Sequence, residues 1–293
     1  MVSVEELESL DIQMWVRSGE EASSRLNCSQ STVSRRNNDV LDLFTLRMER
    51  DNLSEWILRG DSTLLRMERN VHQFYRFNHH QAKLRLEATF WAGPTLTDPA
   101  PEGWLNGIWD HFGMERPLYL LRERIIDAWI GSYQPDLPDK DDPEFCVIDL
   151  CYTPVKLVAD AKHPLMQCKE ISSEDLESFP SLSLSSGLFP HTEKHLKSHG
   201  LWNTESRMKK YKKAYWENKT EDQVTLCYAT CLGLEVMKNL SVLNYDLGLM
   251  SGESLVVRRD LVDEVRIQEL LSCLKKRVLL KAKVHKELIP ASP

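Results

Sequence analysis

A short run of polar side chains has the residue types that contact DNA. Residues 29–36 read S-Q-S-T-V-S-R-R. Glutamine can pair with the edge of adenine, and arginine can bind guanine or phosphate. Serine and threonine hydroxyls reach base edges and phosphates. The candidate DNA contacts are therefore Ser29, Gln30, Ser31, Thr32, Ser34, Arg35 and Arg36. The alternative is an ordinary solvated helix face.

Residues 19–36 can hold these side chains on the second of two short helices. Ala22 and Leu26 are four residues apart, so both face the same side of the first helix. Asn27 and Cys28 form the turn, Ser29 is a good N-cap, and Val33 is the apolar anchor of the second helix. A helix over 3–16, with Leu7, Leu10 and Met14 on its inner face, packs behind them. The pattern predicts a helix-turn-helix, whose second helix enters the major groove, rather than a plain helical hairpin.

A wider pattern runs through the same stretch. Its residues are Ala22, Ser23, Leu26, Ser29, Gln30, Ser31, Val33 and Ser34, followed in W-I-L-R-G-D-S-T-L-L by Gly60, Leu64 and Leu65. In these positions the chain resembles the DNA-binding end of LysR-type transcriptional regulators. The resemblance implies a winged helix-turn-helix domain over residues 1–60.

Residues 61–80 predict a long helix with an apolar seam. Asp61 or Ser62 can cap it, and Leu64, Met67, Val71 and Phe74 recur at spacings of three and four. One interpretation is a helix packed on its own domain. The one we favour is a linker and dimerisation helix over 61–82, with the four apolar residues at the contact between two chains.

From residue 83 strands alternate with helices, which indicates an α/β domain over 83–293. We expect helices at 101–112, 123–130, 222–234 and 262–278, and strands at 84–90 and 117–121. Separate strands are expected at 144–150 and 155–160, and at 247–250 and 254–259. The fold class is thus α/β with an all-α N-terminal part.

The LysR resemblance continues into this half. The matching residues are Asp142, Pro143, Leu157, Val158, Ala159, His163, Pro164 and Leu165. It implies a two-lobed effector domain like the periplasmic binding proteins, with two crossing strands and a small-molecule effector in the cleft. Such clefts lie beyond strand ends. Hydroxyls there suit a carboxylate or similar anion, so the candidate effector contacts are Thr89, Trp91, Thr95, Ser183, Ser185 and Ser186. Loop serines that only cap turns are the alternative.

Other reactive side chains give weaker patterns. His191, His195 and His199 are spaced by four and would share a helix face, yet no carboxylate or cysteine partner is evident, so no metal is expected. Cys227 and Cys231 fit core positions better than a redox pair. Phosphate-loop, dinucleotide, nucleophile-elbow and H-E-x-x-H zinc motifs are all absent. We therefore expect no catalytic residues and no cofactor, with an enzyme on this fold as the least favoured hypothesis.

Composition bounds the remaining possibilities. The chain has 293 residues, enough for two domains, and seven cysteines, an odd number that suits reduced thiols in the cytoplasm. No segment approaches the length of a membrane span. The net charge of −7 counts against nucleic-acid binding, whereas Arg25, Arg35, Arg36, Arg47 and Arg50 gather near the proposed recognition helix. We expect a cytoplasmic transcriptional regulator that binds double-stranded DNA and a small-molecule effector as a homodimer or homotetramer.

The main alternative is a protein that has the same domain architecture but binds DNA only weakly. Asn37 stands where the family usually has an aliphatic residue, and Asp39 and Asp42 add negative charge close to the DNA. The first lysine is Lys83. These features would suit a ligand-binding or interaction protein, and a steep salt dependence of DNA affinity would distinguish the two.

Overall fold

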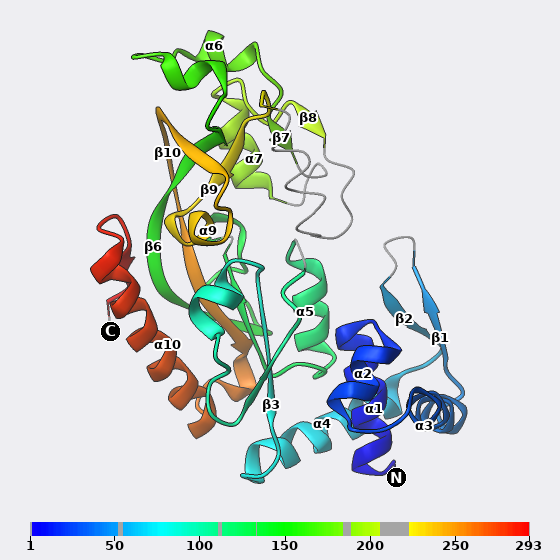
Figure 1. Cartoon of the computed structure of the whole chain (residues 1–293). Helices are drawn as coiled ribbons and strands as arrows, with labels where there is room; N and C mark the ends of the chain where they lie inside the picture. Colours follow the sequence, from blue (N-terminus) through cyan, green and yellow to red (C-terminus); the bar gives the residue numbers. More distant parts are fainter. Residues whose placement is uncertain are drawn as a thin grey trace. The chain divides into compact units, whose positions relative to one another are not determined.

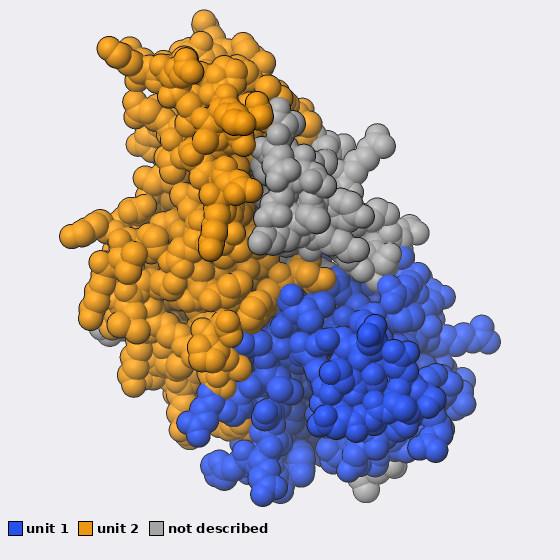
Figure 2. All heavy atoms as spheres, viewed as in Figure 1, with its two compact units in different colours: residues 1–87, 102–108, 115–129 blue, residues 88–101, 109–114, 130–293 orange. Residues whose placement is uncertain are grey.

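The computed structural model describes residues 2–51, 55–110, 113–132, 134–183, 189–205 and 223–292. The chain divides into two compact units, coloured separately in Figure 2. Unit 1 comprises residues 1–87, 102–108 and 115–129, and unit 2 comprises residues 88–101, 109–114 and 130–293. In the described part of the chain, no helix is long and apolar enough to cross a membrane.

Three helices open unit 1, as the sequence predicts. They are α1 (Val4–Val16), α2 (Gly19–Arg25) and α3 (Gln30–Leu43). Ser3 and Glu6 form a capping box at the start of α1, and Ser18 and Ser29 cap α2 and α3. The apolar side chains Leu7, Leu10, Ile12, Met14 and Trp15 of α1 are buried, as are Ala22 and Val33. These contacts hold the two-helix motif against α1.

Asn37 is buried on the inner face of α3. Its amide nitrogen donates to Gln13 Oε1 of α1 at 2.7 Å, while its own Oδ1 has no hydrogen-bond partner. An amide therefore occupies this helix–helix contact in place of an aliphatic side chain. The packing of α3 on α1 is kept, at the cost of one unsatisfied carbonyl oxygen.

A hairpin and a long helix follow in unit 1. Strands β1 (Arg47–Arg50) and β2 (Trp56–Arg59) pair antiparallel, with Arg47 opposite Arg59. Helix α4 spans Thr63–Asn78. Ser62 is its N-cap residue but makes no cap bond; Asp61 Oδ1 instead accepts from the Thr63 backbone at 2.9 Å. Gly60 has φ +117°, and a side chain there would contact Leu46, so the hairpin needs glycine before α4.

Strand β3 (Leu84–Ala88) lies between β4 (Trp104–Asn106) and β5 (Ala128–Gly131), with β3 and β4 parallel. Helix α5 spans Glu115–Arg122. Three sequence predictions are wrong here: 101–112 contains a strand, 117–121 is helical, and 123–130 leads into a strand. The apolar residues of such short runs fit either periodicity. Residues 104–106 and 128–131 become strands because they lie beside β3.

Unit 2 is organised by two very long antiparallel strands, β6 (Phe145–Asp160) and β10 (Leu240–Arg258), which run side by side in Figure 1. Each replaces the two separate strands expected from the sequence. Strands β9 (Cys227–Ala229) and β11 (Ile289–Pro290) also pair with β6. Helix α10 (Val265–Val284) packs on β6 and β11. The sequence interruptions at residues 151–154 and 251–253 read as loops but are absorbed into continuous strands by the mutual pairing.

The remaining elements of unit 2 are short. They are η1 (Gly93–Thr97), η2 (Gln134–Asp136), η3 (Pro164–Gln167), α6 (Ser173–Glu177), β7 (Leu182–Ser183), α7 (Pro190–Lys197), β8 (Thr204–Glu205), α9 (Cys231–Val236) and η4 (Arg259–Leu261). The prediction of one helix over 222–234 is wrong, because its first part is the strand β9. The capping box of Ser172 and Asp175 is present at α6.

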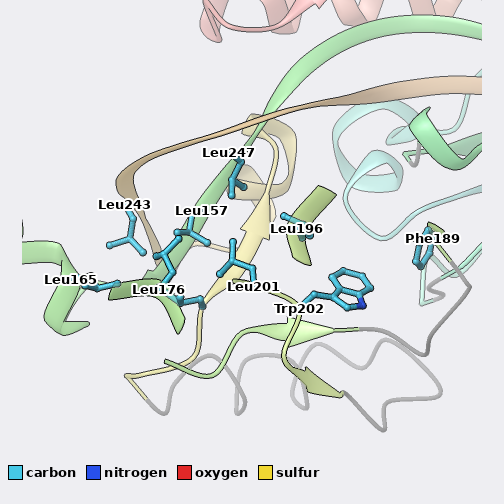
Figure 3. Packing of buried hydrophobic residues seen from close by; sticks show 11 residues of the cluster. Leu157, Leu165, Leu176, Phe189, Leu196, Leu201, Trp202, Leu243 and Leu247 are labelled. Carbon is cyan, nitrogen blue, oxygen red and sulfur yellow. The ribbon is translucent and has the colours of Figure 1, made fainter. Parts of the chain in front are cut away.

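A cluster of buried apolar residues joins these short elements to the long strands. Figure 3 shows Leu157 of β6 and Leu243 and Leu247 of β10 among leucines from the short helices and the connecting segments. Phe189 and Trp202 belong to the same cluster. The cluster holds α6 and α7 on the long strands. Phe189 and Trp202 also form part of the wall of a cavity in unit 2.

Candidate DNA interface and ligand cavity

The N-terminal half of α3 presents short polar side chains to solvent. Ser29, Gln30, Ser31, Ser34 and Arg35 are exposed. Thr32 and Arg36 are half-buried, and Val33 beneath them is buried. Ser29 Oγ accepts from the Thr32 backbone at 3.1 Å and lies 2.8 Å from Ser31 Oγ. All seven candidate DNA contacts therefore lie in the first turns of one helix, whose N-terminus favours phosphate.

Two of the nearby arginines are already engaged within unit 1. Arg25 Nε donates to Glu21 at 2.8 Å, its Nη1 donates to Asn106 O at 2.8 Å, and its guanidinium lies over Trp15. Arg50 lies 4.3 Å from the Trp56 ring centroid. Arg35 and Arg47 are exposed. The local positive charge offered to a ligand is thus smaller than the sequence suggests.

Helix α4 has two different faces. The predicted seam residues Leu64, Met67 and Val71 are 62, 61 and 62% exposed, and Phe74 is 38% exposed. The opposite face buries Arg69, Gln73 and Arg76 in unit 1. A surface helix usually buries its apolar face and exposes its charged face. Helix α4 does the reverse.

Unit 2 contains a cavity of about 140 Å³. Most of its lining side chains are apolar, and none of those described is cationic. The apolar ones are Phe90, Trp91, Pro135, Val155, Leu182, Phe189, Leu196, Trp202, Tyr228, Ala229, Met237 and Leu249. The polar ones are Ser132, Ser183, Thr192, Thr230 and Ser251. A cavity of this kind selects for an apolar ligand with few hydrogen-bonding groups.

A buried polar chain runs along one side of this cavity. Trp91 Nε1 donates to Glu253 Oε1 at 3.0 Å, and Ser132 Oγ donates to Glu253 Oε2. Thr89 Oγ1 lies 2.6 Å from Ser132 Oγ. Burial raises the pKa of Glu253 to about 7, because a carboxylate without water is costly, although the two hydrogen bonds act in the opposite direction. The carboxyl group can therefore gain or lose a proton near neutral pH.

The predicted effector contacts are distributed unevenly. Trp91 and Ser183 line the cavity. Thr89 lies behind it, in contact with Ser132, and Thr95 Oγ1 donates to Trp91 O at 2.5 Å within the η1 turn. Ser185 and Ser186 lie outside the described residues. Trp91 is the predicted residue that both lines the cavity and joins the polar chain.

Comparison with solved structures finds full-length matches at low sequence identity. A cysteine-to-aspartate variant of full-length OxyR from Pseudomonas aeruginosa has a TM-score of 0.56 and 15% identity, covering 100% of this chain and 99% of that chain. Full-length CbnR complexed with its target DNA has a TM-score of 0.53 and 11% identity, covering 94% and 99%. The regulatory domain of MetR, a LysR family regulator from N. meningitidis, has a TM-score of 0.52 and 13% identity, covering 72% and 99%.

The chain has the LysR-type fold. It combines a helix-turn-helix with a periplasmic-binding-protein-like α/β part, as the sequence predicts. No model of a protein family matches the sequence. No curated protein matches it either.

Within this LysR-type fold, two residues of the polar chain beside the cavity, Glu253 and Ser132, were not predicted from the sequence. A signal was present for Glu253, since it is a charged residue at the start of the apolar run S-L-V-V. Charged residues are rarely buried without a partner, so a glutamate inside a strand marks a special position. Ser132 gave no such signal, because a serine after a strand is common in turns.

Two of the three spaced histidines contact β10 of this LysR-type fold. His195 Nε2 lies 2.6 Å from Leu247 O, and His199 Nδ1 lies 2.7 Å from Tyr245 Oη, so both contact β10. Among the described residues no group of three or more histidine, cysteine or acidic side chains could hold a metal. Cys227 and Cys231 are buried, and burial raises the pKa of the Cys231 thiol. Both suit core positions rather than reactive thiols.

Proposed function

We propose that the protein is a transcriptional regulator of the LysR type that binds duplex DNA as a dimer and responds to a small apolar effector. The observation that carries this proposal is α3. Its apolar side is held against α1 and α2, while the exposed N-terminal turns carry serines, a glutamine and an arginine. A helix supported from behind and polar in front can enter a major groove.

The chemistry of these turns supports sequence-specific binding. Gln30 can read adenine, and Arg35 can read guanine or bind phosphate. The β1–β2 hairpin would add the exposed Arg47. The net charge of −7 opposes binding, so affinity depends on these few local cations and should fall steeply with salt.

The exposed row of α4 supports dimerisation. Leu64, Met67, Val71 and Phe74 form a continuous apolar seam at coiled-coil spacing. A second copy of the chain that contributes the same seam would bury all four residues. Two recognition helices would then be held at a defined distance, as a two-fold-symmetric operator requires.

The experiment is selection of bound duplexes from a random DNA pool, followed by sequencing. The unmodified protein should enrich a two-fold-symmetric site. Arg35→Ala should weaken binding to that site by about 1–3 kcal/mol, that is, roughly five- to 150-fold. Lys276→Ala, which removes an exposed charge from α10, should leave the affinity unchanged.

Val71→Glu extends the same experiment to the dimer. A carboxylate in an apolar seam should separate the chains and reduce the enriched sequence to a half-site. A folded protein that enriches no sequence at low salt would refute DNA binding, and would favour a ligand-binding protein of the same architecture.

The unit 2 cavity supports an uncharged effector instead of the anion expected from the sequence. Its described lining carries no cation, and Glu253 beside it would repel an anion when ionised. A cavity of roughly 150 Å³ in another protein holds benzene, so an aromatic ring fits the available volume. We propose a small uncharged aromatic or aliphatic molecule. Its binding would favour one arrangement of the effector domain and thereby change the DNA affinity.

Indole and benzoate distinguish the two effector classes. Indole should raise the melting temperature of the protein in a concentration-dependent manner, and benzoate at the same concentration should have a smaller effect. Ser183→Leu, which fills part of the cavity, should weaken indole binding by about ten-fold or more. Ser173→Leu, at an exposed site on α6, is the matched control. Tighter binding of benzoate would contradict the uncharged class.

A further inference from the structure

A second and larger cavity lies entirely within unit 1. Its volume is about 550 Å³, within the range of roughly 300–1,000 Å³ that is usual for ligand sites. It is bounded by α1, the end of α2, the C-terminal half of α4, the segment 79–83 and the start of β3. The lining differs in kind from that of the unit 2 cavity, because most of its side chains are polar or charged.

The charges in this cavity are mainly basic. Of the 16 lining residues, seven are arginine, lysine or histidine and two, Glu8 and Asp11, are acidic. Arg25 is compensated by Glu21, and Arg76 by Asp127 at 2.8 Å. The groups left to bind a ligand are the side chains of Arg85, Lys83, His79 and His80. Burial lowers the pKa of His72, so its imidazole is not counted among the charges.

Arg85 is a buried guanidinium without close compensation. It is 1% exposed, and its ion-pair distances are long: 3.5 Å from Nη1 to Asp11 Oδ2 and 3.9 Å from Nη2 to Glu8 Oε1. Asp11 makes its closer pair with Arg69, at 2.8 Å. Arg85 Nη1 donates to Ile125 O, but Nε has no hydrogen-bond partner. A buried charge with a free donor is unfavourable unless a further acceptor is bound.

The exposed part of the lining adds one lysine and two imidazoles on one short segment. His79, His80 and Lys83 are exposed and lie within five consecutive residues. The His79 ring packs on Tyr75, with centroids 4.0 Å apart, which orients it beside α4. In the described part of the chain, no ion pair involves His80 or Lys83. The cavity therefore has cationic groups at both its buried and its exposed ends.

We propose that this cavity binds a small oxyanion with at least two charged groups, either carboxylates or phosphates. One anionic group would lie near Arg85, and the other near Lys83 and His80. Arginine and lysine bind such groups through charge-assisted hydrogen bonds. Asp11 Oδ2 accepts no hydrogen bond from the described residues, but the carboxylate pairs with Arg69 and lies 3.5 Å from Arg85, which disfavours a cation there. An apolar ligand would leave the polar lining unsatisfied.

Such a ligand would contact α1 and α2, the two helices on which α3 packs. Glu8 and Asp11 belong to α1 and Arg25 to α2, whereas Lys83 and Arg85 belong to the segment that follows α4. An anion bound between them would link α1 and α2 to β3. This would be a second effector site, distinct in position and chemistry from the unit 2 cavity, and its existence does not depend on DNA binding.

Isothermal titration of the whole protein with pyrophosphate, citrate and acetate at constant ionic strength tests the proposal. One of the two multivalent anions should bind saturably with one site per chain, and the one that binds identifies phosphate or carboxylate as the preferred group. The double variant His80→Ala with Lys83→Ala should weaken this binding about ten-fold or more. Both side chains are exposed, so the variant should remain folded.

Two controls separate this site from other positive surfaces. His191→Ala with Lys194→Ala removes the same residue types from α7 in unit 2 and should leave the affinity unchanged. Arg35→Ala should also leave it unchanged, which excludes binding at the recognition helix. The proposal is overturned if neither multivalent anion binds at millimolar concentration, if acetate binds equally well, or if a control variant weakens binding to the same extent.

Discussion

Replacing Asp127 with alanine should destabilise the protein by about 3–5 kcal/mol, the usual cost of removing one partner from a buried ion pair. Asp127 is fully buried in unit 1. It accepts from Arg76 Nη2 at 2.8 Å and Nε at 3.2 Å, from Gln73 Nε2 at 2.9 Å and from the Arg85 backbone at 2.8 Å. Removing the carboxylate takes away the acceptor of four hydrogen bonds and the nearest negative charge to the Arg76 guanidinium.

This carboxylate is one part of a larger buried ionic network in unit 1. Arg69, on the same face of α4, donates to Asp11 at 2.8 Å and to Glu123 at 3.0 Å. Arg116 Nε donates to Glu55 at 2.7 Å. Such networks are sensitive to the loss of any one member, because the remaining charges stay buried. The Asp127 substitution should therefore affect all of α4, and the dimer seam with it.

Urea unfolding monitored by tryptophan fluorescence measures the effect of Asp127→Ala. Asp141→Ala, in an exposed loop, is the matched control and should change the unfolding free energy by less than about 0.5 kcal/mol. A loss below about 1 kcal/mol for Asp127→Ala would show that Arg76 does not depend on this carboxylate.

Replacing Glu253 with glutamine should stabilise the protein at pH 8 by about 3 kcal/mol. Burial raises the pKa of Glu253 to about 7, well above the ordinary value of a glutamate. Above the folded-state pKa the carboxylate is ionised and buried, which is costly. Glutamine is neutral at every pH and can still accept from Trp91 and hydrogen-bond to Ser132.

The pH dependence gives a second readout of the same residue. Because the folded pKa is raised, the folded state keeps a proton that the unfolded state has lost. The contribution of Glu253 is thus fully favourable below about pH 4.5, and it is lost as the pH rises to about 7. Glu253→Gln should remove this decline from the urea-unfolding profile. The exposed Glu174→Gln should retain it, and a parallel profile for Glu253→Gln would contradict a buried, titrating carboxyl group.

Local sequence signals were enough for the N-terminal helices. Ser3, Ser18 and Ser29 cap three helices, and the apolar positions repeat at helical spacing. A cap and its helix are within a few residues of each other, so their hydrogen bonds depend little on the rest of the chain. The apolar row of α4 was likewise indicated by spacing, whereas its exposure to solvent is known only from the structure.

In the α/β part, the sequence did not predict correctly which of the short segments are strands and which are helices. Residues 104–106 and 128–131 are strands because β3 lies beside them, and residues 115–122 form a helix. Short segments with only a few apolar residues fit either structure until a partner is chosen. The long strands β6 and β10 were interrupted in the sequence by polar residues that pairing with each other accommodates.

What the sequence by itself determined is the helix-turn-helix, the seam of α4 and the general α/β order, because these follow from caps, spacing and alternation along the chain. Tertiary structure alone decided the chemistry of the two cavities. Residues 91, 132 and 253 are far apart in sequence, and only folding places Trp91 and Ser132 on the Glu253 carboxyl group. Burial of that group sets its pKa, and burial of Arg85 leaves a donor without an acceptor, since both effects depend on the removal of water by distant segments.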